Sequence, residues 1–173
     1  MERRLHQMKR KNRFIALAMG VLLLLAAGIL LLPRHYETVG VAEDLEFGMA
    51  PFEVRARWGT PDEEESCAEA PEVTYIYCGS FDSHPAVYSF TFVRVSLGYA
   101  LYAANVRVDV ADGGAVYDRI LENLRQAYSA SDSYYERVDP SGVFLGTGDG
   151  AVFVDCEISR TETTVAASAI RMW

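Results

Sequence analysis

Three cysteines give this 173-residue chain its clearest capacity for covalent chemistry. Cys67 and Cys78 stand eleven positions apart, the first in an acidic loop and the second at the end of a predicted strand. In an oxidising compartment they could close a disulfide that stabilises the fold by about 3 kcal/mol. Cys156 shares the parity of the apolar residues in its own strand, which predicts a buried and unreactive thiol. The alternative is that all three thiols are free or buried.

Other motifs that resemble catalytic or metal sites have the wrong spacing. The segment Asp82-Ser83-His84 contains the residue types of a hydrolase triad, but consecutive residues rarely converge on one point. The acidic run 62–65 lacks the alternating oxygen ligands of a calcium loop, and no helix follows the glycine-rich run 146–150 to hold a phosphate. We therefore expect no catalytic, cofactor-binding or metal-binding residue, and no enzyme. A carboxylate pair such as Asp109 and Glu157 is the basis of a less favoured alternative, a carboxylate-dependent hydrolase.

Aromatic residues are prominent in the predicted strands. Alternation places several of them on one face of their strand, which has two interpretations. They either pack against a covering helix, or they form an exposed sheet face of the composition that protein interfaces favour. The candidate interface aromatics are Tyr75, Tyr77, Tyr88, Phe90 and Tyr99.

Charge is divided unevenly along the chain. The formal net charge is −8, but residues 1–13 carry +5 and the remaining residues carry −13, with no lysine after Lys11. Such an acidic body repels phosphate backbones, so we expect no nucleic-acid binding.

An uncharged apolar run occupies residues 14–32. As a helix it would span roughly 28 Å, which is close to the hydrocarbon thickness of a bilayer. The basic cluster before it predicts a cytoplasmic N-terminus and a translocated C-terminal part. A cleaved signal peptide is the alternative, but the run is longer than a usual signal core and no small-x-small cleavage site follows it. The sequence therefore predicts a single-pass signal anchor in the cell membrane.

These segments divide the chain into four parts. We expect a basic cytoplasmic tail at 1–13, a transmembrane anchor at 14–32, a stalk at 33–44 and an extracytoplasmic domain at 45–173. Helical patterns cover 49–59 and 114–128, the second with Asp112 as its N-cap. Period-two patterns predict strands at 73–78, 87–97, 99–110, 134–138, 142–145, 151–158 and 163–172.

The expected fold class is α+β, with a transmembrane helix followed by short helices packed on an antiparallel sheet. The two helical segments align at an offset of 70 residues, and each precedes several strands. This order is compatible with two helix-plus-strands half-repeats or with chance similarity.

Residues Gly48 to Val54 and Trp58-Gly59-Thr60-Pro61 form a motif of glycine, Glu-Val, aromatic and Gly-x-Pro. This motif resembles the opening segment of the β-lactamase-inhibitor-protein-like domains, a pattern shared by the small lipoprotein of the outer-membrane barrel-assembly machinery. The resemblance covers residues 48–61. It implies a helix-plus-sheet module outside a membrane that binds other proteins and has no catalytic centre. This chain has an apolar anchor segment where that lipoprotein has a lipidated cysteine.

Together these features predict a membrane-anchored, non-enzymatic protein-binding or envelope-associated module. Its partners would be the bilayer, through residues 14–32, and a protein outside the membrane. The alternative is a subunit or sensor of a membrane assembly.

Overall fold

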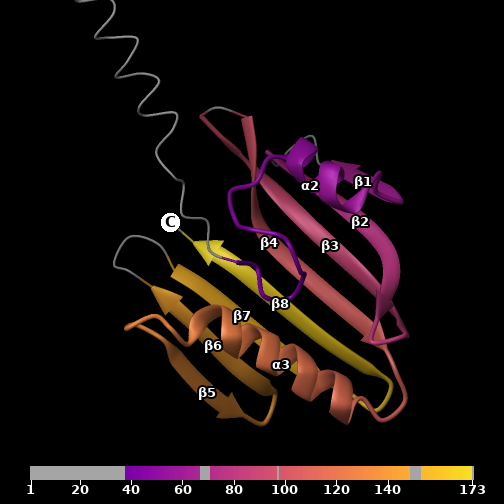
Figure 1. Cartoon of the computed structure of the whole chain (residues 1–173), viewed down its shortest axis with the longest axis vertical. Helices are drawn as coiled ribbons and strands as arrows, with labels where there is room; N and C mark the ends of the chain where they lie inside the picture. The colour runs from indigo at the N-terminus through magenta and orange to yellow at the C-terminus, as the bar shows by residue number, and fades with distance from the viewer. Residues whose placement is uncertain (1–37, 67–70, 97, 149–152, 173) are drawn as a thin grey trace, which may run out of the picture. The chain divides into compact units, whose positions relative to one another are not determined.

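One antiparallel sheet of eight strands dominates the computed structural model, which describes residues 38–66, 71–96, 98–148 and 153–172. The chain divides into two units, residues 1–35 and 36–173, and all the described elements belong to the second. The strands are β1 (Glu63–Ser66), β2 (Glu72–Phe81), β3 (His84–Val95), β4 (Gly98–Asp109), β5 (Tyr135–Asp139), β6 (Gly142–Gly148), β7 (Phe153–Arg160) and β8 (Thr164–Met172). Two helices, α2 (Pro51–Trp58) and α3 (Gly114–Tyr128), complete the described elements (Figure 1).

The strand order in the sheet is β1-β2-β3-β4-β8-β7-β6-β5. Each helix precedes four consecutive strands in the chain, and the two sets of four meet where β4 pairs with β8. At this junction Ala104 lies opposite Ala169, and Val106 lies opposite Ala167. Small residues are therefore frequent in the middle of the sheet.

The α+β class predicted from the sequence is wrong. The described part is mostly sheet, with helices of only 8 and 15 residues that make up about 18% of it. The alternation in β3 and β4 extends over 12 residues in each strand, and all eight strands join one continuous sheet. Two short helices cover only part of such a sheet and do not form a second layer of comparable size.

The transmembrane helix included in that class is not among the helices of the described residues. No helix within the described residues is both long and apolar enough to cross a membrane. The apolar run 14–32 lies outside the described residues.

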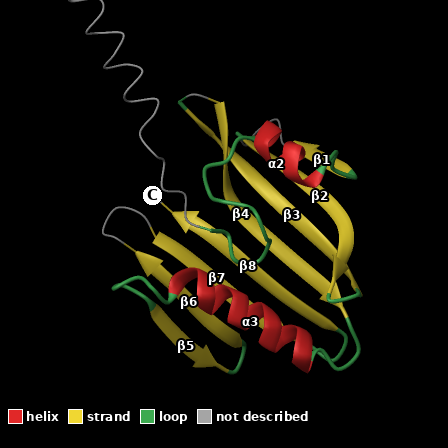
Figure 2. Ribbon diagram, viewed as in Figure 1, coloured by secondary structure: helices red, strands yellow, loops and turns green. Residues whose placement is uncertain are grey.

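Both helices lie on the same face of the sheet (Figure 2). The amphipathic pattern of α3 turns Val116, Ile120 and Leu124 inward, where all three are buried, and α3 packs against β6, β7 and β8. The segment between residue 38 and α2 lies on this face as well (Figure 1). The core is therefore confined to one side of the sheet.

The domain begins earlier than the sequence predicts. Val39, Val41 and Ala42, which fall in the expected stalk, are at most 4% exposed and belong to the core. The backbone N–H of Val39 donates to the carbonyl oxygen of Leu45 at 3.0 Å, which folds this segment back on itself.

The expected N-cap of α3 is also wrong. Gly113 occupies the N-cap position, and no side chain caps this end. Asp112 instead adopts φ +56° in the turn after β4, a conformation that Asp tolerates better than most residues.

Candidate functional site

Four of the five candidate interface aromatics are core residues. Tyr75, Tyr77, Tyr88 and Phe90 are at most 7% exposed, so the packing interpretation holds for them. The indole of Trp58 at the end of α2 explains their burial, because it makes edge-on contacts with three of these rings. Its centroid lies 5.6 Å from that of Tyr77 and 4.8 Å from those of Tyr88 and Phe90. Tyr99, in contrast, is 37% exposed at the start of β4.

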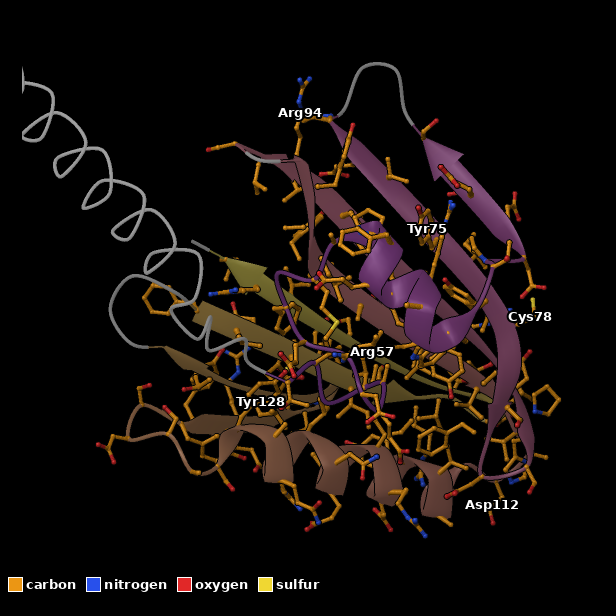
Figure 3. All side chains as sticks on the ribbon, turned by 45° about the horizontal axis from the view of Figure 1, so that its top comes forward. Arg57, Tyr75, Cys78, Arg94, Asp112 and Tyr128 are labelled. Atoms are coloured by element: carbon orange, nitrogen blue, oxygen red, sulfur yellow. The ribbon has the colours of Figure 1, made fainter. Side chains whose placement is uncertain are left out.

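The cysteines lie in different environments. Cys78 is exposed on β2, away from both helices (Figure 3), and its backbone N–H donates to a carboxylate oxygen of Asp62 at 2.6 Å. Cys67 lies outside the described residues, so its pairing with Cys78 stays a prediction. Cys156 is 2% exposed, and burial raises the pKa of its thiol to about 12. The predicted burial of Cys156 is confirmed.

The triad-like segment forms a hairpin turn. Asp82 and Ser83 both have positive φ, +47° and +69°, and they connect Phe81 to its pairing partner His84, which begins β3. This is the conformation of a two-residue type I′ turn. Asp82, Ser83 and His84 are therefore consecutive residues of a tight turn and the strand that follows it, which is not the convergent geometry of a catalytic triad.

The carboxylates Asp109 and Glu157 are far apart. Glu157 lies opposite Ser168 and Asp109 lies opposite Thr164, so they are separated by four residues along the strands and two strand spacings. Strand geometry converts this to about 16 Å, beyond the separation of a glycosidase carboxylate pair. Within the described ranges, no three His, Cys, Asp or Glu residues are grouped so that they could hold a metal ion.

The other face of the sheet carries no helix in the part of the chain that the structure describes, and we name it the open face. Two adjacent rows of paired residues cross all eight strands on it. The first row is Glu63, Ile76, Ser89, Asn105, Ser168, Glu157, Phe144 and Arg137. The second row is Glu65, Thr74, Thr91, Ala103, Ile170, Asp155, Gly146 and Tyr135.

The middle of the open face is formed by small side chains. Neighbouring strands are joined there by hydrogen bonds between polar side chains. The Asn105 amide donates to the Ser89 hydroxyl at 3.2 Å, and the hydroxyls of Thr74 and Thr91 are 3.1 Å apart. A hollow of about 410 Å³ lies in this part of the face, and Ser89, Asn105 and Ser168 are among the residues that line it.

Larger side chains gather at the β5 end of the open face, around a hollow of about 330 Å³. Tyr135, Phe144 and Ile170 contribute apolar surface to it, and Asp155 and Glu157 contribute charge. Tyr135 is 45% exposed and Ile170 is 37% exposed, and two further apolar side chains of this end, Phe153 and Met172, are 48% and 45% exposed. This end combines a depression with accessible apolar groups, which is the arrangement of a recognition site.

The hollow depends on a glycine for its shape. Gly146 pairs with Tyr135 on one side and Asp155 on the other, and the Tyr135 hydroxyl donates to the Asp155 carboxylate across it. A Cβ at position 146 would overlap the carbonyl oxygen of Val154 and lie 2.9 Å from the Tyr135 hydroxyl. Burial, followed by the hydrogen bond to Asp155, raises the pKa of Tyr135 to about 12. Tyr135 therefore remains a neutral donor at physiological pH.

A second ordered contact lines the same hollow. The guanidinium of Arg137 lies 4.9 Å from the ring centroid of Phe144, within cation–π range. Sequence reasoning did not single out these residues. The alternation in β5 and β8 indicates which residues share a face, but it does not indicate which face the helices leave uncovered.

Comparisons of this chain with family models, curated proteins and solved structures found no match. The resemblance of residues 48–61 to the β-lactamase-inhibitor-protein-like domains therefore stays a prediction.

Proposed function

We propose that this chain is a non-enzymatic protein-binding module that uses its open face, and that residues 14–32 hold it at the outer side of a membrane. The observation that supports the proposal is the hollow at the β5 end, where Tyr135, Phe144 and Ile170 provide apolar surface without a covering element in the described chain. Tyrosine, phenylalanine and arginine are the side chains enriched in protein interfaces.

The charge of the chain favours one class of partner. Residues 14–173 carry a net charge of −13, and the hollow contains Asp155 and Glu157 against Arg137. A basic protein segment is attracted by this field, and an apolar side chain within the segment fills the hollow. The proposed partner is therefore a protein with an exposed basic segment that carries an apolar or aromatic side chain.

Anchoring supports the same function. Anchoring through the apolar residues 14–32 would confine the domain to the membrane surface and would raise its effective concentration toward partners in the same membrane. The basic tail before residue 14 favours a cytoplasmic N-terminus.

The test uses the detergent-solubilised full chain as bait in an extract of the source membrane and envelope. Ile170→Glu places a charge at the edge of the hollow, whereas Phe52→Ser removes a 72% exposed apolar side chain from α2 on the opposite side. We expect one protein to be retained by the wild type and by Phe52→Ser, and to be lost at least about tenfold with Ile170→Glu. Retention should also fall as salt is raised.

Two outcomes would contradict the proposal. Ile170→Glu could retain the partner as well as the wild type does, or Phe52→Ser could lose it equally. Circular dichroism and thermal unfolding of each variant ensure that the comparison is made between folded proteins.

A further inference from the structure

A second cavity, of about 300 Å³, lies on the opposite side of the sheet from the open face. The β2–β3 turn, α3, the end of α2 and the segment before it contribute to its walls. The side chains that decide its chemistry are Trp58, Phe81, Tyr88, Glu43, Asp82 and Arg119. Its volume is at the lower end of small-molecule sites, which suits a compact head group.

Aromatic rings form the apolar part of this cavity. Trp58 and Tyr88 meet edge to face, with centroids 4.8 Å apart and planes at 71°. The contacts of Trp58 with two further buried rings, Tyr77 and Phe90, hold the indole in place. The face of an aromatic ring carries partial negative charge, so a fixed aromatic wall attracts cations.

Two carboxylates add negative charge to the same cavity. Glu43 and Asp82 line it, and after burial their charges are the next causes that raise the pKa of the Tyr88 hydroxyl. Both carboxylates therefore act on the aromatic wall. Asp82 is positioned by the tight β2–β3 turn, where its φ is +47°.

Arg119 is the cationic side chain in this lining, and its hold on the carboxylates is weak. Its Nε lies 3.8 Å from Oδ2 of Asp82, and the two side chains are 62% and 45% exposed. Exposed pairs of this length contribute little free energy, so a better cation can replace Arg119 at Asp82. Two carboxylates against one guanidinium leave a net negative cavity.

We propose that this cavity binds an alkylammonium cation, with the ammonium head against Trp58 and Tyr88 and close to Glu43 and Asp82. An anion would be repelled by the two carboxylates, Glu43 and Asp82. A neutral apolar guest would displace water from the carboxylates without pairing them, which is costly. The head group can come from choline or from a lysine side chain, since both present an alkylammonium.

The fluorescence of Trp58 can report binding in this cavity. The full chain with Trp173→Phe retains Trp58 as its single tryptophan. In maltoside micelles, which contain no ammonium group, its fluorescence is followed as choline is added. We expect a saturable change with a midpoint of about millimolar. The neutral isostere 3,3-dimethylbutan-1-ol should cause no saturable change over the same range.

A parallel titration with N-acetyl-lysine methylamide distinguishes the source of the head group. Tighter binding of choline indicates a quaternary head group, and tighter binding of the lysine derivative indicates a peptide side chain. Failure of both cations to bind overturns the proposal, as does equal binding of the neutral isostere.

Substitutions of the carboxylates and of Arg119 should change the affinity for choline in opposite directions. Glu43→Gln and Asp82→Asn should each weaken choline binding at least fivefold, and asparagine suits the positive φ at position 82. Arg119→Gln should strengthen binding, because it frees Asp82 for the guest. Glu162→Gln, an exposed carboxylate in the β7–β8 turn, is the matched control and should leave the midpoint unchanged.

Unchanged affinity in both Glu43→Gln and Asp82→Asn, or weaker binding in Arg119→Gln, overturns the proposal. Saturation-transfer NMR of choline with each variant provides a second readout that does not depend on the indole. The choline titration is independent of the protein-binding function proposed for the open face, because the residues changed here line a different cavity from the one that contains Ile170.

Discussion

The hydroxyl of Tyr128 lies 2.6 Å from the carbonyl oxygen of Thr38, ninety positions earlier in the chain. It is also 2.9 Å from the carbonyl oxygen of Val39. Tyr128, which is labelled at the end of α3 in Figure 3, is 2% exposed. This contact joins the first described residues of the domain to the end of its longer helix, so the segment expected to be a stalk is part of the cooperative core.

Replacing Tyr128 with phenylalanine should destabilise the domain by about 1–2 kcal/mol, because the buried carbonyl oxygen of Val39 loses a donor without gaining water. Urea unfolding of the full chain followed by circular dichroism measures the change. Tyr102→Phe is the matched control, since it removes a 3.2 Å hydrogen bond to Glu72 on a partly exposed strand residue. An equal loss in both variants would contradict a special role for Tyr128.

The Cys156 thiol should resist alkylation in the native protein. Burial raises its pKa to about 12 from the ordinary 9.0, so neither access nor the thiolate form is available at pH 8. We expect iodoacetamide, added after mild reduction of any Cys67–Cys78 disulfide, to modify Cys78 in the native chain, and Cys156 only after unfolding in urea, as located by mass spectrometry. Rapid native modification of Cys156 would show that this part of the core opens readily.

The same pKa shift has a consequence for stability. The folded state holds the thiol proton more tightly than the unfolded state, so this contribution is complete below pH 9 and declines as the pH rises toward 12. The wild type should therefore lose more stability than Cys156→Ala over that interval. An equal loss of stability in the wild type and Cys156→Ala would contradict the raised pKa of the Cys156 thiol.

Local patterns in the sequence predicted some elements well. The helix predicted at 114–128 is confirmed as α3, because its apolar residues recur at helical spacing and turn toward the sheet. Alternation likewise indicated which residues of β4 share a face, and 99–110 differs from the observed 98–109 by one residue at each end.

Relationships between distant segments were not predictable in this way. The β4–β8 pairing joins residues about sixty positions apart, and no local pattern specifies it. The aromatic stripe of Tyr88 and Phe90 was visible, but its burial depends on Trp58 from α2, which covers it. The hollow at the β5 end depends on four strands being adjacent, so its residues could not be grouped from their spacing.

Glu136 should make the stability of the domain sensitive to acid. It accepts hydrogen bonds from Arg125 Nε at 3.1 Å, Arg125 Nη2 at 2.6 Å and the Tyr134 hydroxyl at 2.6 Å. The bonds from Arg125, followed by that from Tyr134, lower its pKa from 4.5. Because the folded state favours the carboxylate, this stabilisation is present above pH 4.5 and is lost as the pH falls through the lowered pKa.

Glu136→Gln should therefore cost about 1 kcal/mol at pH 7, a modest value because Arg125 is 43% exposed. The cost should shrink at acid pH, so the difference between the two urea midpoints narrows. Glu122→Gln, on the exposed side of α3, is the control and should show no such narrowing. A pH-independent difference for Glu136→Gln would assign its effect to packing.

Glycine in place of Ser83 should stabilise the protein. Ser83 has φ +69° at the second position of the two-residue turn between β2 and β3, where a side chain is strained and glycine is favoured. Relief of this strain exceeds the extra unfolded-state entropy of glycine, and we expect a gain of about 0.5 kcal/mol in urea unfolding. Ser141→Gly in the β5–β6 turn is the opposite control, because it removes the hydroxyl that donates to Asp139 at 2.5 Å and adds backbone freedom to the unfolded chain. That variant should lose stability, and a shift of the same sign in both variants would show that backbone strain at Ser83 does not limit the stability of the sheet.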